Sequence, residues 1–123
     1  MPRITISEVS SIENQLGRAL PELYRKLLVE FGHGCVGLDA EIYHPLEVRD
    51  LYEPFLDDPT QLFNPFFPFG CDNQNQELWI IDADSDRAAS IWHETHPDDW
   101  PEGRWISYSQ WIDEFLDPII CGA

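Results

Sequence analysis

The segment from Ile12 to Gly34 constrains the fold most, because it ends one helix, begins a second and ends that one in turn. Gly17 can take the left-handed backbone conformation that ends a helix. Pro21 suits the first turn of the next helix, where no N–H donor is needed. The two helices have to turn against each other, and we expect their apolar faces to share one core.

Apolar spacing assigns a buried face to each of these helices. Val9, Ile12 and Leu16 follow the i, i+3, i+7 pattern of a first helix, for which we expect Ser7 to be the N-cap. The buried face of the second helix is predicted to consist of Leu20, Tyr24, Leu27, Leu28 and Phe31. Gly32 and Gly34 are expected to end it.

The middle of the chain has short β-forming segments separated by turn-forming residues. We predict strands over 41–44, 66–70, 77–82 and 90–93, with turns at 71–76 and 82–86. Apolar side chains in 77–82 point to both faces, which is typical of a central strand covered on both sides. Because these strands follow one another closely, we predict an antiparallel meander.

Three further segments complete the predicted organisation. Residues 48–55 have helical spacing for one or two turns, residues 57–65 form a surface loop, and residues 93–103 form a second loop. Ser107 and Gln110 form an S-x-x-Q capping box that begins a last helix. Its apolar face is Trp111, Ile112, Phe115 and Leu116, and Pro118 is expected to end it near Asp117.

These elements predict one α+β domain over residues 1–123, with N-terminal helices, a central antiparallel sheet and a C-terminal helix. Aromatic residues make up 13% of the chain, so the acidic composition does not indicate disorder. The formal net charge of −16 repels nucleic-acid phosphates and anionic membranes and favours a basic protein partner.

The cysteines and the N-terminus bear on the compartment. Cys35, Cys71 and Cys121 are far apart, and an odd number without a C-x-x-C pair predicts reduced thiols. No apolar run has the length of a signal peptide core or of a membrane span. We therefore expect a cytoplasmic protein.

Two motifs invite comparison with metal sites, and neither matches its template. Asp82, Asp84 and Asp86 resemble the first half of a calcium loop, but Arg87 occupies the position of the essential glycine. His93 and His96 are separated by one residue too few for the H-E-x-x-H zinc motif. We expect no metal and no other cofactor.

No sequence motif indicates catalysis. The chain has no G-x-S-x-G nucleophile elbow, and none of its cysteines lies in an activating sequence context. Paired acids such as Asp57-Asp58 are typical of a solvated acidic surface. A hydrolase is the weakest of the function classes considered, and we expect no enzyme activity.

Several short sequence blocks follow one another in a distinctive order. The opening block has Ile-Glu, Leu-Gly and Leu-Pro pairs, then a Tyr, and then Leu-Leu before Phe-Gly-x-Gly. The later blocks are residues 66–72, 78–82, 91–94 and 107–116. This order of blocks resembles the SMI1/KNR4 (SUKH) superfamily, which includes many bacterial immunity proteins. The departure is at 73–77, where the family usually has a glycine-rich turn, so the shape of that turn is left open.

This resemblance implies an immunity protein that binds and neutralises a toxin domain in the cytoplasm. The alternative is a general intracellular binding or scaffolding module, as the family's eukaryotic members suggest. Aromatic rings bordered by acids suit an interface that receives Lys and Arg. The expected partner-binding residues are Asp82, Asp84, Asp86, Glu94, Asp98, Asp99 and Trp100. Trp100 either belongs to that interface or folds back as a lid on the core, and both interpretations stay open.

Overall fold

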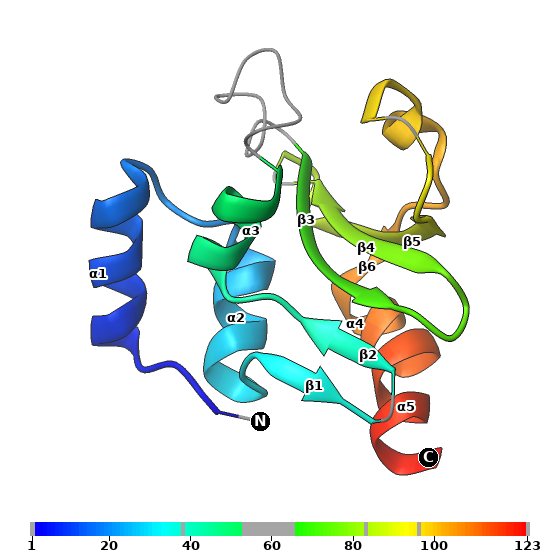
Figure 1. Ribbon diagram of the computed structural model, residues 1–123, viewed down its shortest axis with the longest axis horizontal. Coiled ribbons are helices and arrows are strands. Elements are labelled where there is room, and N and C mark those ends of the chain that lie inside the picture. The colour runs from blue at the N-terminus through cyan, green and yellow to red at the C-terminus, as the bar shows by residue number, and fades with distance from the viewer. Residues whose placement is uncertain (1, 38, 53–65, 83, 96, 123) are drawn as a thin grey trace.

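The computed structural model describes residues 2–37, 39–52, 66–82, 84–95 and 97–122 (Figure 1). Its chain forms an α+β fold with a six-stranded sheet in the order β1-β2-β3-β4-β5-β6, and every neighbouring pair is antiparallel. The predicted fold class and the predicted meander are confirmed. The predicted loop at 57–65 lies outside the described residues.

The first two helices follow the predicted order. α1 spans Ile6–Leu16 and α2 spans Glu22–Glu30. Gly17 has φ 77° and donates its N–H to the carbonyl of Glu13, which confirms it as the helix end. The buried residues of both helices belong to one core cluster, so the shared core is confirmed as well.

The N-cap of α1 is Thr5, so the prediction of Ser7 was wrong. The Thr5 hydroxyl accepts from the backbone N–H of Glu8, and the Glu8 carboxylate accepts from the backbone N–H of Thr5. This reciprocal capping box satisfies two donors at once, which a cap at Ser7 would not do. Pro21 is the residue just before α2 rather than the first residue in it.

The segment between α2 and β3 has more regular structure than expected. β1 spans Gly34–Val36, β2 spans Ala40–Ile42 and α3 spans Pro45–Tyr52. The predicted strand over 41–44 was therefore placed too late, and the predicted helical turns from Val48 begin earlier, at Pro45. Proline at the first position of a helix loses no hydrogen bond, which explains the earlier start.

The predicted hairpin over residues 66–82 is confirmed. β3 spans Phe66–Asp72, β4 spans Glu77–Asp82 and β5 spans Arg87–Trp92. All four residues from Leu78 to Ile81 are buried, as expected for a central strand. A register shift between Pro68 and Gly70 interrupts the β3–β4 ladder around Phe69.

Helices from both ends of the chain cover one face of the sheet. The ring of Phe69 contacts Tyr24 of α2, with centroids 6.1 Å apart, and Trp111 near the C-terminus, with centroids 5.0 Å apart. Trp111 also donates its indole N–H to the hydroxyl of Ser90 on β5 at 3.3 Å. This aromatic cluster joins α2, the sheet and the C-terminal helices in one core.

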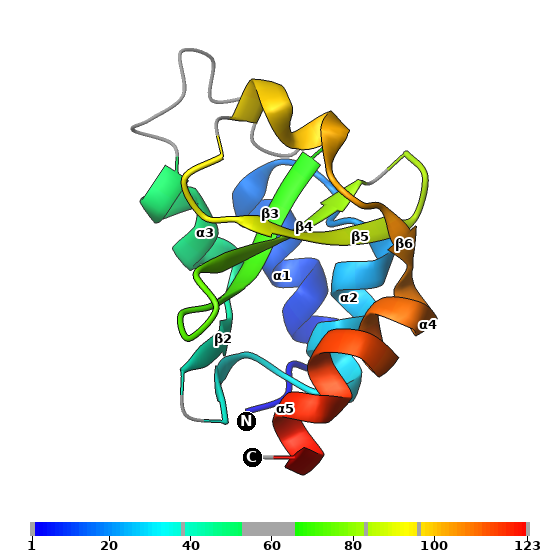
Figure 2. The same cartoon turned by 90° about the vertical axis from the view of Figure 1, so that its right-hand side faces the viewer.

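The other face of the sheet is covered by residues 97–105, which we call the covering segment. It contains the 3-10 helix η3, Pro97–Glu102, where the sequence predicted only a loop. Figure 2 shows η3 and the C-terminal helices on opposite sides of β5. The Trp105 ring stacks on the Phe66 ring, with centroids 5.4 Å apart. Strand β6, Ile106–Ser107, follows and pairs with the beginning of β5.

The C-terminal helix does not end at Asp117. It consists of α4 (Tyr108–Trp111), a π-helical turn η4 (Ile112–Leu116) and α5 (Asp117–Gly122). Pro118 directly follows the π-helical turn, in which the N–H of Asp117 bonds to the carbonyl of Ile112 five residues back, so the regular i−4 pattern is already interrupted there. Ser107 accepts from the N–H of Gln110 as predicted, but the Gln110 side chain donates to Glu114, so only half of the capping box forms.

Candidate protein-interaction surface

The predicted acidic turn connects β4 and β5, and its three aspartates have different roles. The Asp82 carboxylate accepts from the N–H of Asp84 and from the hydroxyl of Ser85, both at 2.9 Å. Asp82 therefore stabilises the turn itself, in the manner of an Asx turn. Asp84 and Asp86 are exposed, and Asp86 has the left-handed φ of 53° that completes the turn. Those two carboxylates are the ones presented to solvent.

Glu94, Asp98 and Asp99 lie after the far end of β5. Glu94 follows Trp92 by two residues, whereas Asp82 is paired with Arg87 at the other end of the same ladder. Strands of this length span roughly 17 Å at about 3.3 Å per residue. Asp98 and Asp99 are exposed in the first turn of η3. The predicted acids therefore form two groups rather than one compact cluster.

Trp100 is a lid on the core and is not available as an interface residue. Its side chain is 6% exposed, and its indole N–H donates to the carbonyl of Thr95 at 3.2 Å. Gly103 follows closely, and a Cβ there would lie 3.0 Å from Ile91 and 3.3 Å from the Trp100 carbonyl. The sequence left open whether Trp100 belongs to an interface or covers the core. Because its side chain is buried against β5, it covers the core.

Trp92 is an exposed aromatic residue that the sequence did not point to. Its side chain is 56% exposed at the end of β5, although a tryptophan is usually mostly buried. The His93 ring approaches it edge-on, with centroids 5.8 Å apart, and Glu77 is its partner in the β4–β5 register. Glu94 is also exposed and lies 3.9 Å from the His93 imidazole. Trp92 thus has the aromatic and acidic surroundings that were assigned to Trp100.

A pocket of about 370 Å³ lies at the same end of the sheet. His93 borders it and is fixed there, since its backbone N–H donates to the Gln76 carbonyl at 2.9 Å and its Nδ1 lies 3.1 Å from the same oxygen. The lining is mostly polar, in contrast to the mostly apolar lining typical of small-molecule sites. It comprises Tyr43, Cys71, Asn73, Gln76, Glu77, Leu78 and His93.

Burial raises the pKa of two groups in this lining, Glu77 and Cys71. Burial, and after it the charge of Asp72, raises the pKa of the Glu77 carboxyl. A basic group placed beside Glu77 would favour its ionised form. Burial also raises the pKa of the Cys71 thiol. A raised thiol pKa lowers the fraction of thiolate, so this environment does not activate Cys71 as a nucleophile.

The charge is distributed unevenly along the chain. Residues 1–30 contain four basic and four acidic side chains, whereas residues 31–123 contain three basic and nineteen acidic ones. The whole formal charge of −16 therefore belongs to the part of the chain that forms the sheet, the covering segment and the C-terminal helices. A composition taken over the whole chain hides this difference, but counting the two parts separately would have found it.

The two metal motifs have limited structural support. Among the described residues, no group of three or more His, Cys, Asp or Glu side chains is arranged to hold a metal ion. Asp82 uses its carboxylate for the turn, as described above. His96, the second histidine of the zinc comparison, lies outside the described residues.

Comparison with known proteins adds no assignment, since no family model and no curated protein matches this chain. Within the described part of the chain, no helix combines the length and the apolar character needed to cross a bilayer.

Proposed function

We propose that this protein binds a basic protein partner, and that Trp92 is the central residue of the binding surface. Following the resemblance noted in the sequence, we propose that the partner is a bacterial toxin domain. The protein would neutralise that domain in the cytoplasm, by binding rather than by catalysis.

The observation that carries the proposal is an exposed tryptophan on a strongly acidic protein. Trp92 is 56% exposed, its partner in the β4–β5 register is Glu77, and the exposed Glu94 follows it by two residues. Tryptophan is among the residues that most often dominate the binding energy of interfaces, where it fills a desolvated centre. The surrounding carboxylates can receive Lys or Arg from the partner through charge-assisted hydrogen bonds.

The net charge supports the same class of partner through the rate of encounter. A surface of one sign attracts an oppositely charged protein and can raise the association rate by factors of roughly 10 to 1,000. Asp84, Asp86, Asp98 and Asp99 are exposed and add to that field. A small basic toxin domain would therefore be captured quickly, which suits a protein that has to neutralise a toxin before it acts.

The test begins with co-purification from the native cell, followed by expression of the captured domain in cells that lack this protein. We expect the domain to be basic, to inhibit growth alone, and to lose that effect when this protein is co-expressed. The Trp92→Ala variant should protect less well at equal expression. Failure of the wild-type chain to protect would overturn the immunity function, and capture of acidic partners only would overturn the basic partner as well.

A further inference from the structure

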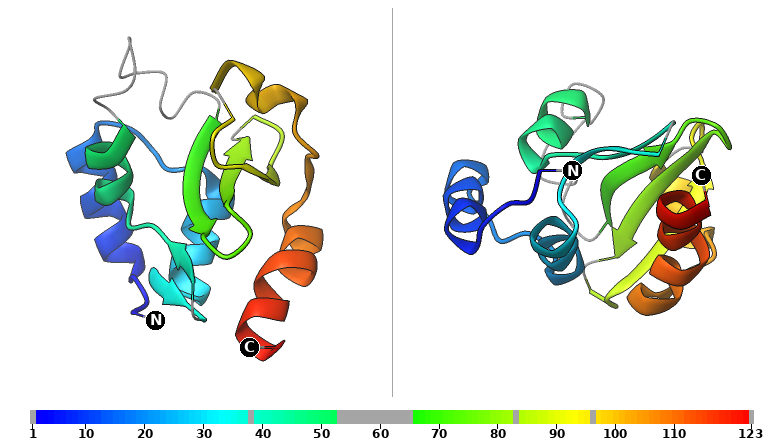
Figure 3. Two further views of the ribbon diagram at one scale, coloured as in Figure 1. Left: turned by 45° about the vertical axis from the view of Figure 1, so that its right-hand side comes forward. Right: turned by 90° about the horizontal axis from the view of Figure 1, so that it is seen from below.

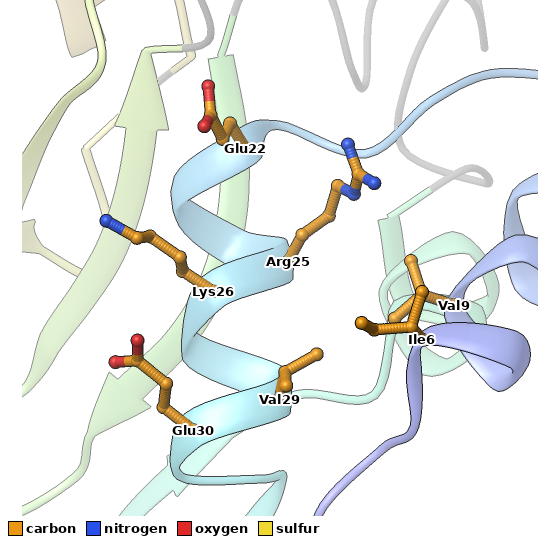
Figure 4. Close-up of a pocket in the computed structure, with 7 residues that line it drawn as sticks. All are labelled: Ile6, Val9, Glu22, Arg25, Lys26, Val29 and Glu30. Carbon is orange, nitrogen blue, oxygen red and sulfur yellow. The ribbon is translucent and has the colours of Figure 1, made fainter.

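The side of the molecule formed by α1 and α2 contains a groove of about 280 Å³ that the proposed function does not use. Figure 4 shows Ile6 of α1 and Val29 of α2 on opposite sides of it. Ile6 is 71% exposed, which is high for an isoleucine, and Val29 is only partly buried. The groove thus presents an apolar centre to solvent.

The charges around this groove alternate in sign. Glu22, Lys26 and Glu30 follow one another at four-residue intervals along the exposed face of α2. Lys26 forms no ion pair within the described part of the chain. The Nε of Arg25 lies 4.0 Å from a carboxylate oxygen of Glu13, which is a long distance for an ion pair. This face therefore offers both signs of charge to a partner.

From these observations we infer that the α1–α2 face is a homodimer interface in which a second copy of this chain occupies the groove. The rest of the chain has a formal charge of −16, so two copies that meet through other surfaces repel each other. The α1–α2 part is neutral and is self-complementary. If two α2 helices pack antiparallel about a two-fold axis that passes midway between Lys26 and Glu30, Lys26 of each faces Glu30 of the other.

The dimer leaves the proposed partner surface accessible. Figure 1 shows α1 and α2 on one side of the molecule and the end of β5 on the other, and Figure 3 shows the C-terminal helices remote from α1 in both views. The interface helices are short, about 16 Å and 14 Å at 1.5 Å per residue. We therefore expect a dimer that dissociates on dilution rather than an obligate one.

Light scattering coupled to size-exclusion chromatography, from about 1 to 500 μM protein, measures this equilibrium. The mass should rise with concentration from 14.3 kDa towards twice that value. Ile6→Glu should stay at the monomer mass throughout, and its melting temperature should not fall, since Ile6 is exposed and an acid suits the first turn of a helix. Trp92→Glu introduces the same acid at an exposed residue on the other side of the molecule, and it should leave the dimer intact.

Charge reversal tests the pairing itself. Lys26→Glu and Glu30→Lys should each shift the midpoint of dimerisation to higher concentration, because each places like charges opposite each other. The double variant with both changes should restore it. The inference is overturned by a constant monomer mass up to the highest concentration, by an unchanged dimer in Ile6→Glu, or by a double variant no better than the single ones.

Discussion

Trp92 and Glu77 are partners in the β4–β5 register, so an exposed indole and a partly buried carboxylate lie side by side at one end of the sheet. The neighbouring pair on the same face, Trp79 and Ser90, lies under Trp111. The covered pair belongs to the core, and the uncovered pair is available to a partner.

Trp92→Ala should weaken partner binding by about 2 kcal/mol or more, the range for a central interface residue. The loss should appear mainly as faster dissociation, because the ring supplies buried contact area and not charge. Surface plasmon resonance with the captured partner measures both rates. Stability in urea should change by less than about 1 kcal/mol. An unchanged dissociation rate would remove Trp92 from the interface.

Trp100→Ala should mainly reduce the stability of the fold, in contrast to Trp92→Ala, which should mainly weaken partner binding. The ring is buried and its N–H bonds to the Thr95 carbonyl, so truncation should cost about 3 to 5 kcal/mol of unfolding free energy. Urea denaturation followed by circular dichroism gives this value. A cost below about 0.5 kcal/mol would mean that the covering segment does not depend on this residue.

Leu27→Ala and Trp111→Ala should each cost about 2 to 5 kcal/mol, since both side chains are fully buried. Trp111 loses its contacts with Phe69 and Trp79 together with the hydrogen bond to Ser90. Leu51→Ala is a matched control, because Leu51 lies on a helix but is 45% exposed. Equal losses for Leu27 and Leu51 would contradict the assignment of the core.

Association with the basic partner should slow several-fold between about 50 and 500 mM salt, as screening shortens the range of the charges. Asp84→Lys with Asp86→Lys should slow association further, and the dissociation rate should change much less. Asp113→Lys with Asp117→Lys alters the net charge equally on the C-terminal helix and serves as the control. An equal effect of both pairs would show that net charge matters and the β4–β5 turn does not.

Glu77→Gln should stabilise the fold at pH 7 and have no effect well below pH 4.5, the ordinary pKa of a glutamate. The folded pKa of Glu77 is raised, so the wild-type residue loses its favourable contribution as the pH rises through that value. Chemical denaturation of both chains at several pH values measures the difference. A difference that does not vary with pH would contradict the assigned cause.

Glu114→Gln is the control of opposite sign. Hydrogen bonds from Arg104 and from Gln110 lower the pKa of Glu114, so its contribution is present at neutral pH and is lost as the pH falls through the lowered value. This substitution should therefore destabilise the fold at pH 7 and not at low pH. Matching pH profiles for the two variants would contradict the assignment of either group.

The fold could be predicted largely because its signals are local. The helix end at Gly17, the buried face around Leu27 and the two-sided burial of 78–81 depend on residues close in the chain, and each is confirmed. Element boundaries were predicted less accurately, because neighbouring residues compete for the same role. Thr5 and Ser7 can both cap a helix, and the reciprocal bond with Glu8 decided between them.

Only the tertiary structure decided which tryptophan is exposed. Trp92 lies in a strand and Trp100 in a segment rich in prolines and acids, so local patterns favour burying the first and exposing the second. The reverse holds because η3 folds back over β5 and buries Trp100, while Trp92 lies at the end of its strand. By itself, the sequence determined the acidic charge, the α+β class and most of the core. The exposure of a side chain depends on what distant segments cover, and no local pattern contains that information.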